Sequence, residues 1–565
     1  MRSVIPFHND PFIYASLIKA CNKAQALLEG KSIHCRVIRL GLDYNVNVLN
    51  SLVSFYMGSL NLMSYAAVLF DGISEKSVVT VNCMISGNIN RGNLDVAMSL
   101  FVKMLSGCFG LHVKPNYVTF LILISGCVEL GGFRTGNALH CCCCKMGFDC
   151  NLEICNVLID LYAKLGCIFD AASVFRDMPR KDLISWNAMI SGYANCGDFA
   201  QAFSLFREMR IEDVGVDKVS FSCLLSACAA GKDLCLGRMI HAHVKANGLE
   251  FDVSVGTALI SMYARCGKVE YARKLFDEMP KPNIEYWNAM IHAYIENGLA
   301  REALNLLDQI KFREIKPDEV TILGLIMACR DTGELNQGIL VHSIVESGEF
   351  LKGSIILGNA LIDMYAKCGS MTKARAVFDR MSQKDVISWT SMIVGHAVNG
   401  GGVKSLATFK LMCAEKFVPN SVTFIGVLSA CDHAGLVDEG RKLYDMMYND
   451  YHIKPQIEHC GCVVDMLARA GKIEDAQIFI RQMPMEPNAL IWRMLMNGCR
   501  VHGHINLGLT LVTGITELNA SHESADFVIS SNIYAEAGKW GDVVSHRNFM
   551  VVQRDRKAAG KSYVS

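Results

Sequence analysis

The feature that most constrains the fold of this chain is an internal repeat. Cysteine recurs in closely similar phrases at intervals of 106, 101, 101 and 102 residues. The phrases LIKAC, LISGC, LLSAC, LIMAC and VLSAC end at Cys21, Cys127, Cys228, Cys329 and Cys431. A length of 565 residues would otherwise predict about three to five separate globular domains. Regular self-similarity overrides that estimate, so the chain is described by its repeats.

Each long unit contains three shorter repeats. A second phrase is anchored at Asn50, Asn156, Thr257, Asn359 and Gly461, and a third phrase is anchored at Asn82, Asn187, Asn288 and Thr390. In residues 253–283, TALISMYA indicates a first helix, Cys266 and Gly267 end it, and Ala272, Leu275, Phe276 and Met279 follow at helical spacing. A hairpin of 31 to 36 residues cannot bury its apolar face alone, so the hairpins must stack. We therefore expect an all-α solenoid, a superhelix of stacked two-helix repeats.

Composition excludes several classes of function. The 55 basic and 55 acidic side chains cancel, so neither an acidic tail nor a histone-like polycation is present, and any nucleic-acid contact must be local. The 24 cysteines occur in a long chain without a secretory signal and are expected to be reduced thiols. No run approaches eighteen apolar residues, so no membrane association is expected.

Catalytic motifs are not found. Zinc deaminases need a histidine and two cysteines on the metal, with a glutamate two residues after the histidine. None of the 16 histidines stands in an HxE motif, and His522 and Glu523 are adjacent. The run from Cys141 to Cys144 follows His140, but neighbouring helical residues point about 100° apart and cannot all face one ion. The same argument applies to His459, Cys460 and Cys462. We predict no catalytic residue, no metal and no cofactor, and therefore not an enzyme.

The phrases SWNAMISGYA and NALIDMYAKCG and the KPD-type endings resemble a plant pentatricopeptide-repeat (PPR) protein of the PLS subclass. The resemblance covers residues 11 to about 556. It divides the chain into a short N-terminal segment at 1–10, an array of about fourteen repeats at 11–488, extension motifs at 489–556 and a tail at 557–565. The repeats start at 11, 117, 218, 319 and 421 (long-type), at 46, 152, 253, 355 and 457 (short-type), and at 78, 183, 284 and 386 (P-type).

The extension motifs contain IWRMLMNGCRVHGHINLG and FVISSNIYAEAGKWGDVVSHRNFM, which resemble the E-type motifs of editing factors. The tail AAGKSYVS stands where that family usually has a PGCSWIE-like phrase.

Two positions in each short-type and P-type repeat are polar. The fifth positions are Asn50, Asn82, Asn156, Asn187, Thr257, Asn288, Asn359 and Thr390. The last positions of the same repeats are Ser77, Asn116, Asp182, Asp217, Asn283, Asp318, Asp385 and Asn420. Amides, hydroxyls and carboxylates can read the Watson–Crick edge of an unstacked base, one base per repeat. A helix-cap role for the fifth position is the alternative. We favour base reading, because a cap formed by the fifth residue would not explain why the last residue is also polar in all eight repeats.

The fifth positions of the long-type repeats are mostly unable to hydrogen-bond. They are Ala15, Leu121, Ser222, Leu323 and Ile425. The resemblance implies that Asn with Asp favours U, Thr with Asn favours A, and Asn with Ser or Asn favours a pyrimidine, often C. From residue 46 onward it therefore implies C, pyrimidine, unread, U, U, weakly read, A, U, unread, U, A.

The resemblance also implies that apolar second-position residues wedge between bases. Val79, Ile184, Ile356 and Ile387 match that pattern, and Asn47, Glu153, Ser254 and Glu285 depart from it. Basic residues recur late in the first helix of the short-type repeats, and they either contact phosphates or form a solvated helix end. They are Lys164, Arg265, Lys367 and Arg469.

The function implied by the resemblance is sequence-specific binding of single-stranded organellar RNA, along a groove on the concave face, which selects a cytidine for C-to-U editing. The family's DYW-type catalytic domain is not found, so the implied partners are a trans-acting DYW-type deaminase and multiple organellar RNA editing factors. The implied location is the mitochondrion or a plastid, although the ten residues before the first repeat contain no clear transit peptide. An organellar RNA stability, splicing or processing factor, and a protein-binding helical-repeat scaffold, remain alternatives.

Overall fold

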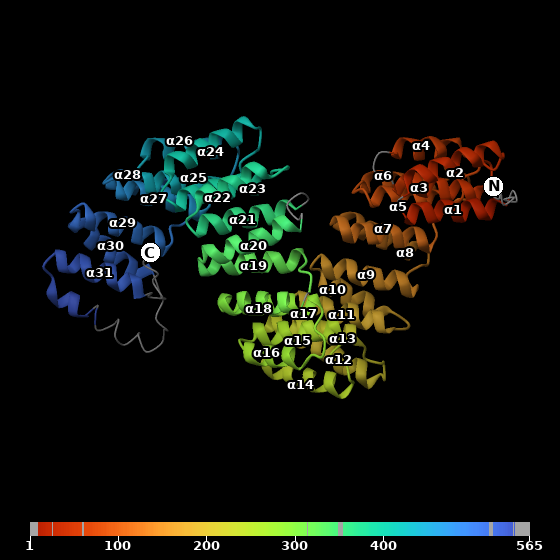
Figure 1. The fold of residues 1–565 in the computed structure, drawn as a ribbon, viewed down its shortest axis with the longest axis horizontal. Coiled ribbons are helices and arrows are strands. Elements are labelled where there is room, and N and C mark those ends of the chain that lie inside the picture. Colours follow the sequence, from red (N-terminus) through yellow and green to blue (C-terminus); the bar gives the residue numbers. More distant parts are fainter. Residues whose placement is uncertain are drawn as a thin grey trace. The chain divides into compact units, whose positions relative to one another are not determined.

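The computed structural model describes residues 10–24, 26–58, 62–313, 315–348, 354–518, 524–545 and 547. Within these residues the structure contains 31 labelled α-helices and no strand. The all-α fold class predicted from the repeats is confirmed. The chain divides into two compact units, residues 1–282 and 283–565. The helices follow one another in chain order within each unit (Figure 1).

The first unit consists of eight helical hairpins. Its helices are α1 (Pro11–Lys23), α2 (Leu27–Arg39), α3 (Val46–Gly58), α4 (Met63–Gly72), α5 (Val78–Ile89), α6 (Leu94–Leu105), α7 (Tyr117–Leu130), α8 (Phe133–Lys145), α9 (Leu152–Lys164), α10 (Ile168–Asp177), α11 (Leu183–Asn195), α12 (Phe199–Ile211), α13 (Lys218–Gly231), α14 (Leu234–Ala246), α15 (Val253–Arg265) and α16 (Val269–Glu278).

The second unit continues the same pattern of hairpins. Its helices are α17 (Ile284–Glu296), α18 (Ala300–Phe312), α19 (Glu319–Thr332), α20 (Leu335–Ser347), α21 (Ile355–Lys367), α22 (Met371–Arg380), α23 (Val386–Val398), α24 (Gly402–Ala414), α25 (Ser421–Ala434), α26 (Val437–Asn449), α27 (Ile457–Arg469), α28 (Ile473–Gln482), α29 (Ala489–Val501), α30 (Ile505–Leu518) and α31 (Ser524–Glu536). Residues 540–545 are also helical.

Each of the fourteen repeat starts expected from the sequence coincides with the first residue of an odd-numbered helix, from Pro11 of α1 to Ile457 of α27. The example repeat has the predicted form. Its first helix α15 is followed by Gly267 at φ 70°, and Ala272, Leu275 and Phe276 of α16 are buried. A positive φ suits glycine because that residue has no Cβ.

The odd-numbered helices, which open the hairpins, form a continuous layer within each unit. Contacts join α1 to α3, α3 to α5 and so on to α15, and likewise α17 to α19 and on to α31. Each even-numbered helix packs against the odd-numbered helix before it. Side chains at the same position of successive odd-numbered helices therefore belong to one row.

The second helix of every long-type repeat lies close to the first helix of the next repeat. Gly30, Gly136, Gly237, Gly338 and Gly440 occupy the same place in α2, α8, α14, α20 and α26. A Cβ atom built on Gly30 would lie 2.1 Å from Cζ of the buried Phe55 ring, and one built on Gly136 would lie 2.7 Å from Leu161 Cδ2. Methionine sulfurs occupy the equivalent place beside the other three glycines. Only a hydrogen fits between the two helices there without a shift of the facing side chain.

A histidine–tyrosine pair joins the same two helices in four of these junctions. Nδ1 of His34 lies 2.7 Å from the Tyr56 hydroxyl, and the pair formed by His241 and Tyr263 measures 2.8 Å. The remaining pairs are His140 with Tyr162 and His342 with Tyr365. Burial lowers the pKa of His34, His140 and His342. The neutral imidazole is therefore favoured in these three histidines.

The segment after residue 488 continues the helical stacking. Helix α29 packs against α27, α30 and α31. Buried Met496, Val512 and Ile533 form a small core, with Trp492 and Tyr534 packed against it. Among the described residues, no helix is both long and apolar enough to cross a membrane.

We expect Gly30→Ala to lower the free energy of unfolding. Forcing a methyl group against the Phe55 ring costs about 1–3 kcal/mol, which outweighs the gain of up to ~1 kcal/mol in helix propensity. Chemical denaturation followed by circular dichroism measures the change. Gly215→Ala is the matched control, because no atom lies within 4 Å of a Cβ built there. If the clash is the cause, Phe55→Leu added to Gly30→Ala restores part of the loss, and a failure of that rescue would contradict it.

Candidate functional site

The last residue of each short-type or P-type repeat with a predicted polar pair is the N-cap of the next odd-numbered helix. These caps are Ser77, Asn116, Asp182, Asp217, Asn283, Asp318, Asp385 and Asn420. All of them except Asn283 form a capping box with a Thr or Ser three residues later. A side-chain oxygen of this kind satisfies an otherwise unpaired N–H at the helix start.

The fifth-position residue of the same repeat forms hydrogen bonds with this cap and with the third residue of the helix that the cap begins. In the repeat that contains α11, the amide Nδ2 of Asn187 donates to Asp217 Oδ1 at 3.2 Å, and Asn187 Oδ1 accepts from the Ser220 hydroxyl at 2.7 Å. The Ser220 hydroxyl oxygen also lies 2.9 Å from Asp217 Oδ1, so its one hydrogen is shared between the two acceptors. Three side chains from two repeats thus form a closed triangle of hydrogen bonds.

The same triangle recurs along both units. Nδ2 of Asn156, Asn288 and Asn359 donates to Asp182, Asp318 and Asp385 at 3.2, 3.1 and 3.1 Å. The hydroxyls of Ser185, Thr321 and Ser388 donate to the amide oxygens Oδ1 of these three asparagines at 2.6 Å. Asn82 joins Asn116 and Thr119 more loosely, at 3.5 and 2.9 Å. The structure therefore brings five of the eight predicted pairs into direct contact.

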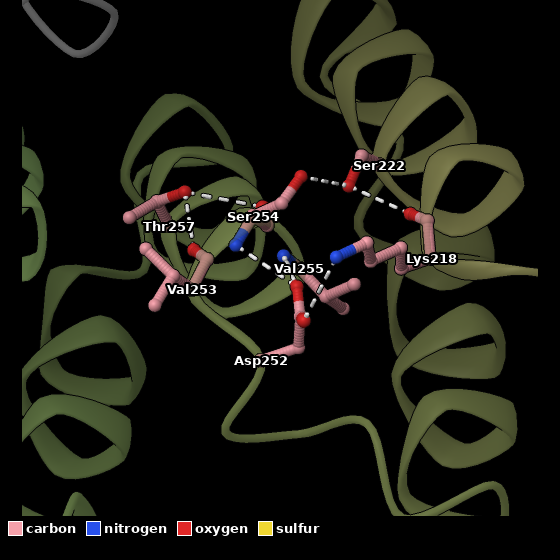
Figure 2. Close-up of polar contacts among 7 residues, drawn as sticks. All are labelled: Lys218, Ser222, Asp252, Val253, Ser254, Val255 and Thr257. Atoms are coloured by element: carbon pink, nitrogen blue, oxygen red, sulfur yellow. Dashed lines mark hydrogen bonds and ion pairs between the residues drawn. The ribbon is translucent and has the colours of Figure 1, made fainter. Parts of the chain in front are cut away.

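The other three pairs differ. Asn50 and Ser77 both bond to the Thr80 hydroxyl, at 2.6 and 2.8 Å. Thr390 contacts the Thr423 hydroxyl at 2.8 Å, and Thr423 in turn donates to Asn420. Thr257 and Asn283 belong to different units. The Thr257 hydroxyl donates to the backbone oxygen of Val253 at 2.8 Å (Figure 2). Asn283 caps α17.

One part of the sequence argument is wrong. We expected that a capping role at the fifth position would leave the last residue without a function. The fifth-position side chains lie inside their helices, and the last residues are themselves the caps. Capping and base contact are therefore not exclusive, because the cap uses one oxygen of a group that has further hydrogen-bonding capacity.

The four aspartate caps are held in the charged form. Burial opposes the charge on Asp182, Asp217, Asp318 and Asp385, but hydrogen bonds from a backbone N–H, from a hydroxyl and from the partner asparagine outweigh it and lower the pKa of each. In Asp182, Asp217 and Asp385 the hydrogen bonds from the neighbouring asparagine and from the Ser three residues later end on Oδ1. Their Oδ2 atoms remain acceptors for a ligand.

Two pockets open beside these triangles in the first unit. One of about 640 Å³ is lined by Asn156, Asn187 and Asp217, together with Ile184 and Lys164. Another, of about 590 Å³, is lined among others by Asn82, Asn116, Val79 and Val118. Polar pairs, second-position aliphatic groups and, in one case, a lysine therefore share a surface.

The second-position aliphatic residues are unusually exposed. Val79 is 57% accessible, Ile184 63%, Ile356 62% and Ile387 58%. Isolated exposed aliphatic residues are common on protein surfaces, but these recur at one place in the repeat next to the polar triangles. Asn47, Glu153, Ser254 and Glu285 are also exposed and supply no aliphatic surface.

The predicted basic residues are exposed at the ends of their helices, and Lys164 and Arg469 lie beside acids. Lys164 lies 3.0 Å from Asp160. Arg469 lies 3.5 Å from Asp432 Oδ2 and 4.0 Å from Asp465. Asp432 is buried, and its Oδ1 has no hydrogen-bond partner. Burial and the neighbouring Asp465 raise the pKa of Asp432 to about 7.

The residues considered for a metal site have other roles. Nδ1 of His140 pairs with Tyr162, and Cys143 is buried while Cys141 and Cys144 are exposed. The buried His459 accepts from the Gln456 backbone N–H through Nδ1, and its Nε2 lies 2.9 Å from the Ser421 backbone oxygen. In the described part of the chain no three metal-binding side chains gather at one point. His522 and Glu523 lie outside it.

Sequence reasoning missed the third-position hydroxyls. Thr80, Thr119, Ser185, Ser220, Thr321, Ser388 and Thr423 connect the cap to the preceding repeat. A signal was present, because a Ser, Thr, Asp or Asn three residues before each one matches the spacing of a capping box.

Family models of known proteins match several parts of the chain. The model described as PPR repeat family matches residues 76–129, 181–230 and 282–331. The pentatricopeptide repeat domain model matches residues 238–297, and the PPR repeat model matches 153–183, 359–386 and 387–417.

Curated relatives extend the match to nearly the full length. The putative pentatricopeptide repeat-containing protein At3g05240 of Arabidopsis thaliana is 34% identical over 98% of this chain and 98% of its own length. This chain belongs to the pentatricopeptide-repeat family. Two further Arabidopsis PPR proteins are At2g03380, named mitochondrial, at 34% identity over 98% of this chain and 80% of that protein, and At1g11290, named chloroplastic, at 32% over 98% and 68%.

A solved structure of the family shows the same fold. The maize PPR protein PPR10 aligns with 97% of this PPR chain and 84% of its own chain, with a TM-score of 0.57 and 16% identity. PPR10 in complex with an 18-nt psaJ RNA element aligns over 97% and 85%, with a TM-score of 0.61.

We expect Asp432→Asn to stabilise this PPR protein at alkaline pH. The folded-state pKa of Asp432 lies above its unfolded value, so the folded state holds a proton that the unfolded state loses, and stability falls as pH rises from about 4 to about 7. An amide removes this dependence and adds on the order of 1–3 kcal/mol at pH 8, but little at pH 4.

Denaturation at a series of pH values measures the effect. Asp308→Asn, which changes an exposed carboxylate in the same unit, is the control. A change in stability that is equal at pH 4 and pH 8 would exclude titration of Asp432 as the cause.

Proposed function

We propose that this chain binds single-stranded RNA in a sequence-specific manner and selects a cytidine for C-to-U editing in an organelle. The observation that carries the proposal is the hydrogen-bonded triangle that recurs at the junctions between successive repeats. Each triangle holds an amide, which is buried in Asn187, Asn288 and Asn359, and a partly exposed cap in one orientation, so that one base can be read by each repeat.

The triangle leaves atoms for a base. In Asn187, one amide hydrogen goes to Asp217 and the oxygen accepts from Ser220. The second amide hydrogen and Asp217 Oδ2 remain for a Watson–Crick edge, which needs both a donor and an acceptor. Preorganisation matters, because side chains already held in place lose less entropy on binding. Asn156, Asn187 and Asp217 line the same pocket, so adjacent repeats offer adjacent base sites.

The neighbouring aliphatic residues supply the stacking surface. Ile184 and Val219 lie at the second positions of consecutive repeats, on either side of Asn187, and both line the pocket. A base that lies between two such side chains contacts apolar surface on both of its faces. Stacking of bases on side chains is a main source of affinity for single-stranded nucleic acids. Lys164 lines the same pocket and can contact a phosphate of the RNA backbone. Such contacts must come from individual basic residues, because the formal net charge of the chain is +0.

The comparisons support this proposal. PPR10, which shares the fold, has a crystal structure in complex with an 18-nt psaJ RNA element. Relatives named mitochondrial and chloroplastic support an organellar location, in the mitochondrion or a plastid. Editing itself rests on the resemblance of the repeats to the PLS subclass and of residues 489–556 to E-type motifs. No HxE motif occurs in these residues, so we assign deamination to a separate DYW-type deaminase, with multiple organellar RNA editing factors as further partners.

Two other functions are distinguished by experiment. A protein-binding scaffold predicts no preference among randomised RNAs. An RNA stability, splicing or processing factor predicts sequence-selective binding, with altered transcript levels or ends but no lost editing site in a knockout. Sequencing organellar transcripts of knockout plants tests editing directly. Selection from randomised RNA tests the order C, pyrimidine, unread, U, U, weakly read, A, U, unread, U, A.

We expect Asp217→Asn to change the base preferred by the repeat at 183–217. The new amide oxygen can still accept from Ser220, so the cap is preserved, while the acceptor-only carboxylate is lost. By family resemblance the preference then moves from U toward C. Selection from randomised RNA should show a shift worth about 1–3 kcal/mol at that nucleotide and none at its neighbours.

The matched control is Asp198→Asn. Asp198 is also an N-cap aspartate, but it begins the second helix α12 of the same repeat. A preference that moved equally in both variants would show that the loss of a negative charge at a helix cap, and not base contact, is responsible.

We expect the C-terminal helices to dock the deaminase. Trp540 is 66% exposed in the helical residues 540–545, and a large aromatic ring on a surface is a common anchor for a partner. Trp540→Ala should reduce editing in complemented knockout plants while RNA affinity changes by less than about twofold, and deletion of residues 489–565 should abolish editing. Arg547 bonds to Ser531, and Arg554, Arg556 and Lys557 lie outside the described residues.

Phe312→Ala is the control, since Phe312 is 90% exposed on α18 of the repeat array. Purified protein should bind RNA and deaminate nothing by itself. A folded Trp540→Ala variant and a folded truncation that both edited at the wild-type level would contradict the docking role.

A further inference from the structure

A second polar row follows the fifth-position row one helical turn later. The ninth residue of the first helix is serine in seven of the fourteen repeats and aspartate in three, so an oxygen recurs at one place. Residues four apart lie on the same face of an α-helix, about 6 Å apart along its axis. The ninth residue is therefore the neighbour of the side chain that we assign to a base. Lys19, Met327 and Val394 offer no acceptor there.

The structure places this ninth-position row in the same pockets as the polar triangles. Asp160 and Ser191 line the pocket of about 640 Å³ that also contains Asn187. The pocket of about 590 Å³ contains Ser86 together with Asn82 of the same helix. The side chains of Asp160, Ser191 and Ser86 are half-buried. An RNA strand that contacts the triangles therefore also lies within reach of the ninth-position oxygens.

Two of the serine hydroxyls are free to bind a ligand. A serine inside a helix commonly donates its hydroxyl to the carbonyl oxygen four residues earlier, as Ser222 does to Lys218 at 2.9 Å. In the part of the chain that the structure describes, Ser86 and Ser125 form no side-chain hydrogen bond, and both are half-buried in a pocket. Their oxygens keep the full capacity to donate and accept.

The residue types of the row indicate which chemical group the ligand presents. A serine hydroxyl donates or accepts, whereas an ionised aspartate only accepts, so one ligand group that suits both must be a donor. Single-stranded RNA has two kinds of donor, the N–H groups of the bases and the 2′-hydroxyl of the ribose. A phosphate has no donor and is repelled by a carboxylate such as Asp160. The base edge is already assigned to the fifth and last positions, which leaves the ribose.

Helix α9 carries contacts for the three parts of a nucleotide in sequence. Asn156, Asp160 and Lys164 follow one another at successive turns, and all three line the same pocket. Nζ of Lys164 lies 3.0 Å from Oδ2 of Asp160. The ribose joins the base to the phosphate in every nucleotide. An acceptor that lies between a base contact and a cation for the phosphate is therefore at the level of the ribose.

We propose that the ninth-position oxygens accept a hydrogen bond from the ribose 2′-hydroxyl, and that the chain thereby distinguishes ribose from deoxyribose at individual nucleotides. The inference rests on the proposed RNA-binding function and deepens it, because it assigns the sugar to a row of residues separate from the base-reading pairs. It also predicts which repeats ignore the sugar. At Val394 the row has an aliphatic side chain, so the nucleotide of that repeat is bound without regard to its 2′ group.

The nucleotide assigned to the repeat at 78–116 provides the test. Full-length protein is titrated with three forms of its selected RNA, which carry a hydroxyl, a hydrogen or a fluorine at the 2′ position of that nucleotide alone. Fluorine keeps the sugar pucker of ribose but cannot donate. Wild-type protein should bind both modified RNAs about three- to tenfold more weakly, the range for one neutral hydrogen bond. Weaker binding of the deoxy form alone would assign the effect to sugar pucker and overturn the proposal.

Variants at Ser86 identify the residue responsible. Ser86→Ala should bind the three RNAs within about twofold of one another and keep the base preference of the repeat. Ser86→Thr retains a hydroxyl and should keep the wild-type difference. Ser99→Ala is the matched control, because it makes the same change on the second helix α6 of the same repeat, where Ser99 is exposed. A difference that persisted in a folded Ser86→Ala variant, as judged by circular dichroism, would contradict the contact.

The repeat at 386–420 provides a test in the opposite direction. Deoxyadenosine at its nucleotide should bind the wild-type protein as tightly as adenosine, because Val394 cannot accept a hydrogen bond. Val394→Ser should introduce a preference for adenosine there. A wild-type protein that lost as much affinity at this nucleotide as at the one beside Ser86 would show a general effect of deoxyribose, and the row would have no role.

The ribose contact and the RNA-binding function fail differently. If the wild-type protein distinguishes bases at the nucleotides assigned to Asn187 and Asn288 but binds all 2′ forms equally, the ribose contact is wrong and the RNA-binding function stands. If it distinguishes neither bases nor sugars, the RNA-binding function itself is wrong.

Discussion

The structure depends on one recurrent interaction, the hydrogen bond from a third-position hydroxyl to the fifth-position side chain of the preceding repeat. The Ser220 hydroxyl reaches Asn187 across 33 residues of sequence and also bonds to the cap Asp217. Buried polar groups have to be satisfied, so a triangle that satisfies three of them fixes the register of one odd-numbered helix against the next. Repetition of the triangle turns a row of separate helices into a continuous surface.

This interaction explains how a rigid scaffold can carry variable chemistry. The cap needs an oxygen that accepts from the helix N-terminus, and Ser, Asn and Asp all provide one. Their remaining atoms differ, since a carboxylate only accepts whereas an amide also donates. A repeat can therefore change what it offers to a ligand without loss of its helix cap.

The long-type repeats have a different structural role. Their second helices approach the next odd-numbered helix closely at Gly30, Gly136 and equivalent glycines, and four of them add a histidine–tyrosine bond. These contacts lie between a second helix and the following first helix. The packing is steric, and burial lowers the pKa of three of the four histidines, His34, His140 and His342. Asp432 of α25 is a buried carboxylate whose loss of a proton lowers the stability of the fold as pH rises from about 4 to about 7.

The sequence by itself determined the repeat, because apolar periodicity and turn residues are local signals. The starts of the hairpins, the break at Gly267 and the buried face of α16 all follow from residues within one repeat. It also identified the polar pairs, but not their geometry. That Asp217 caps a helix while bonding to Asn187, and that Ser222 meets Ser254, was decided by tertiary structure. The physical reason is that these partners are 30 and 32 residues apart, so that only stacking of the hairpins brings them within hydrogen-bonding distance.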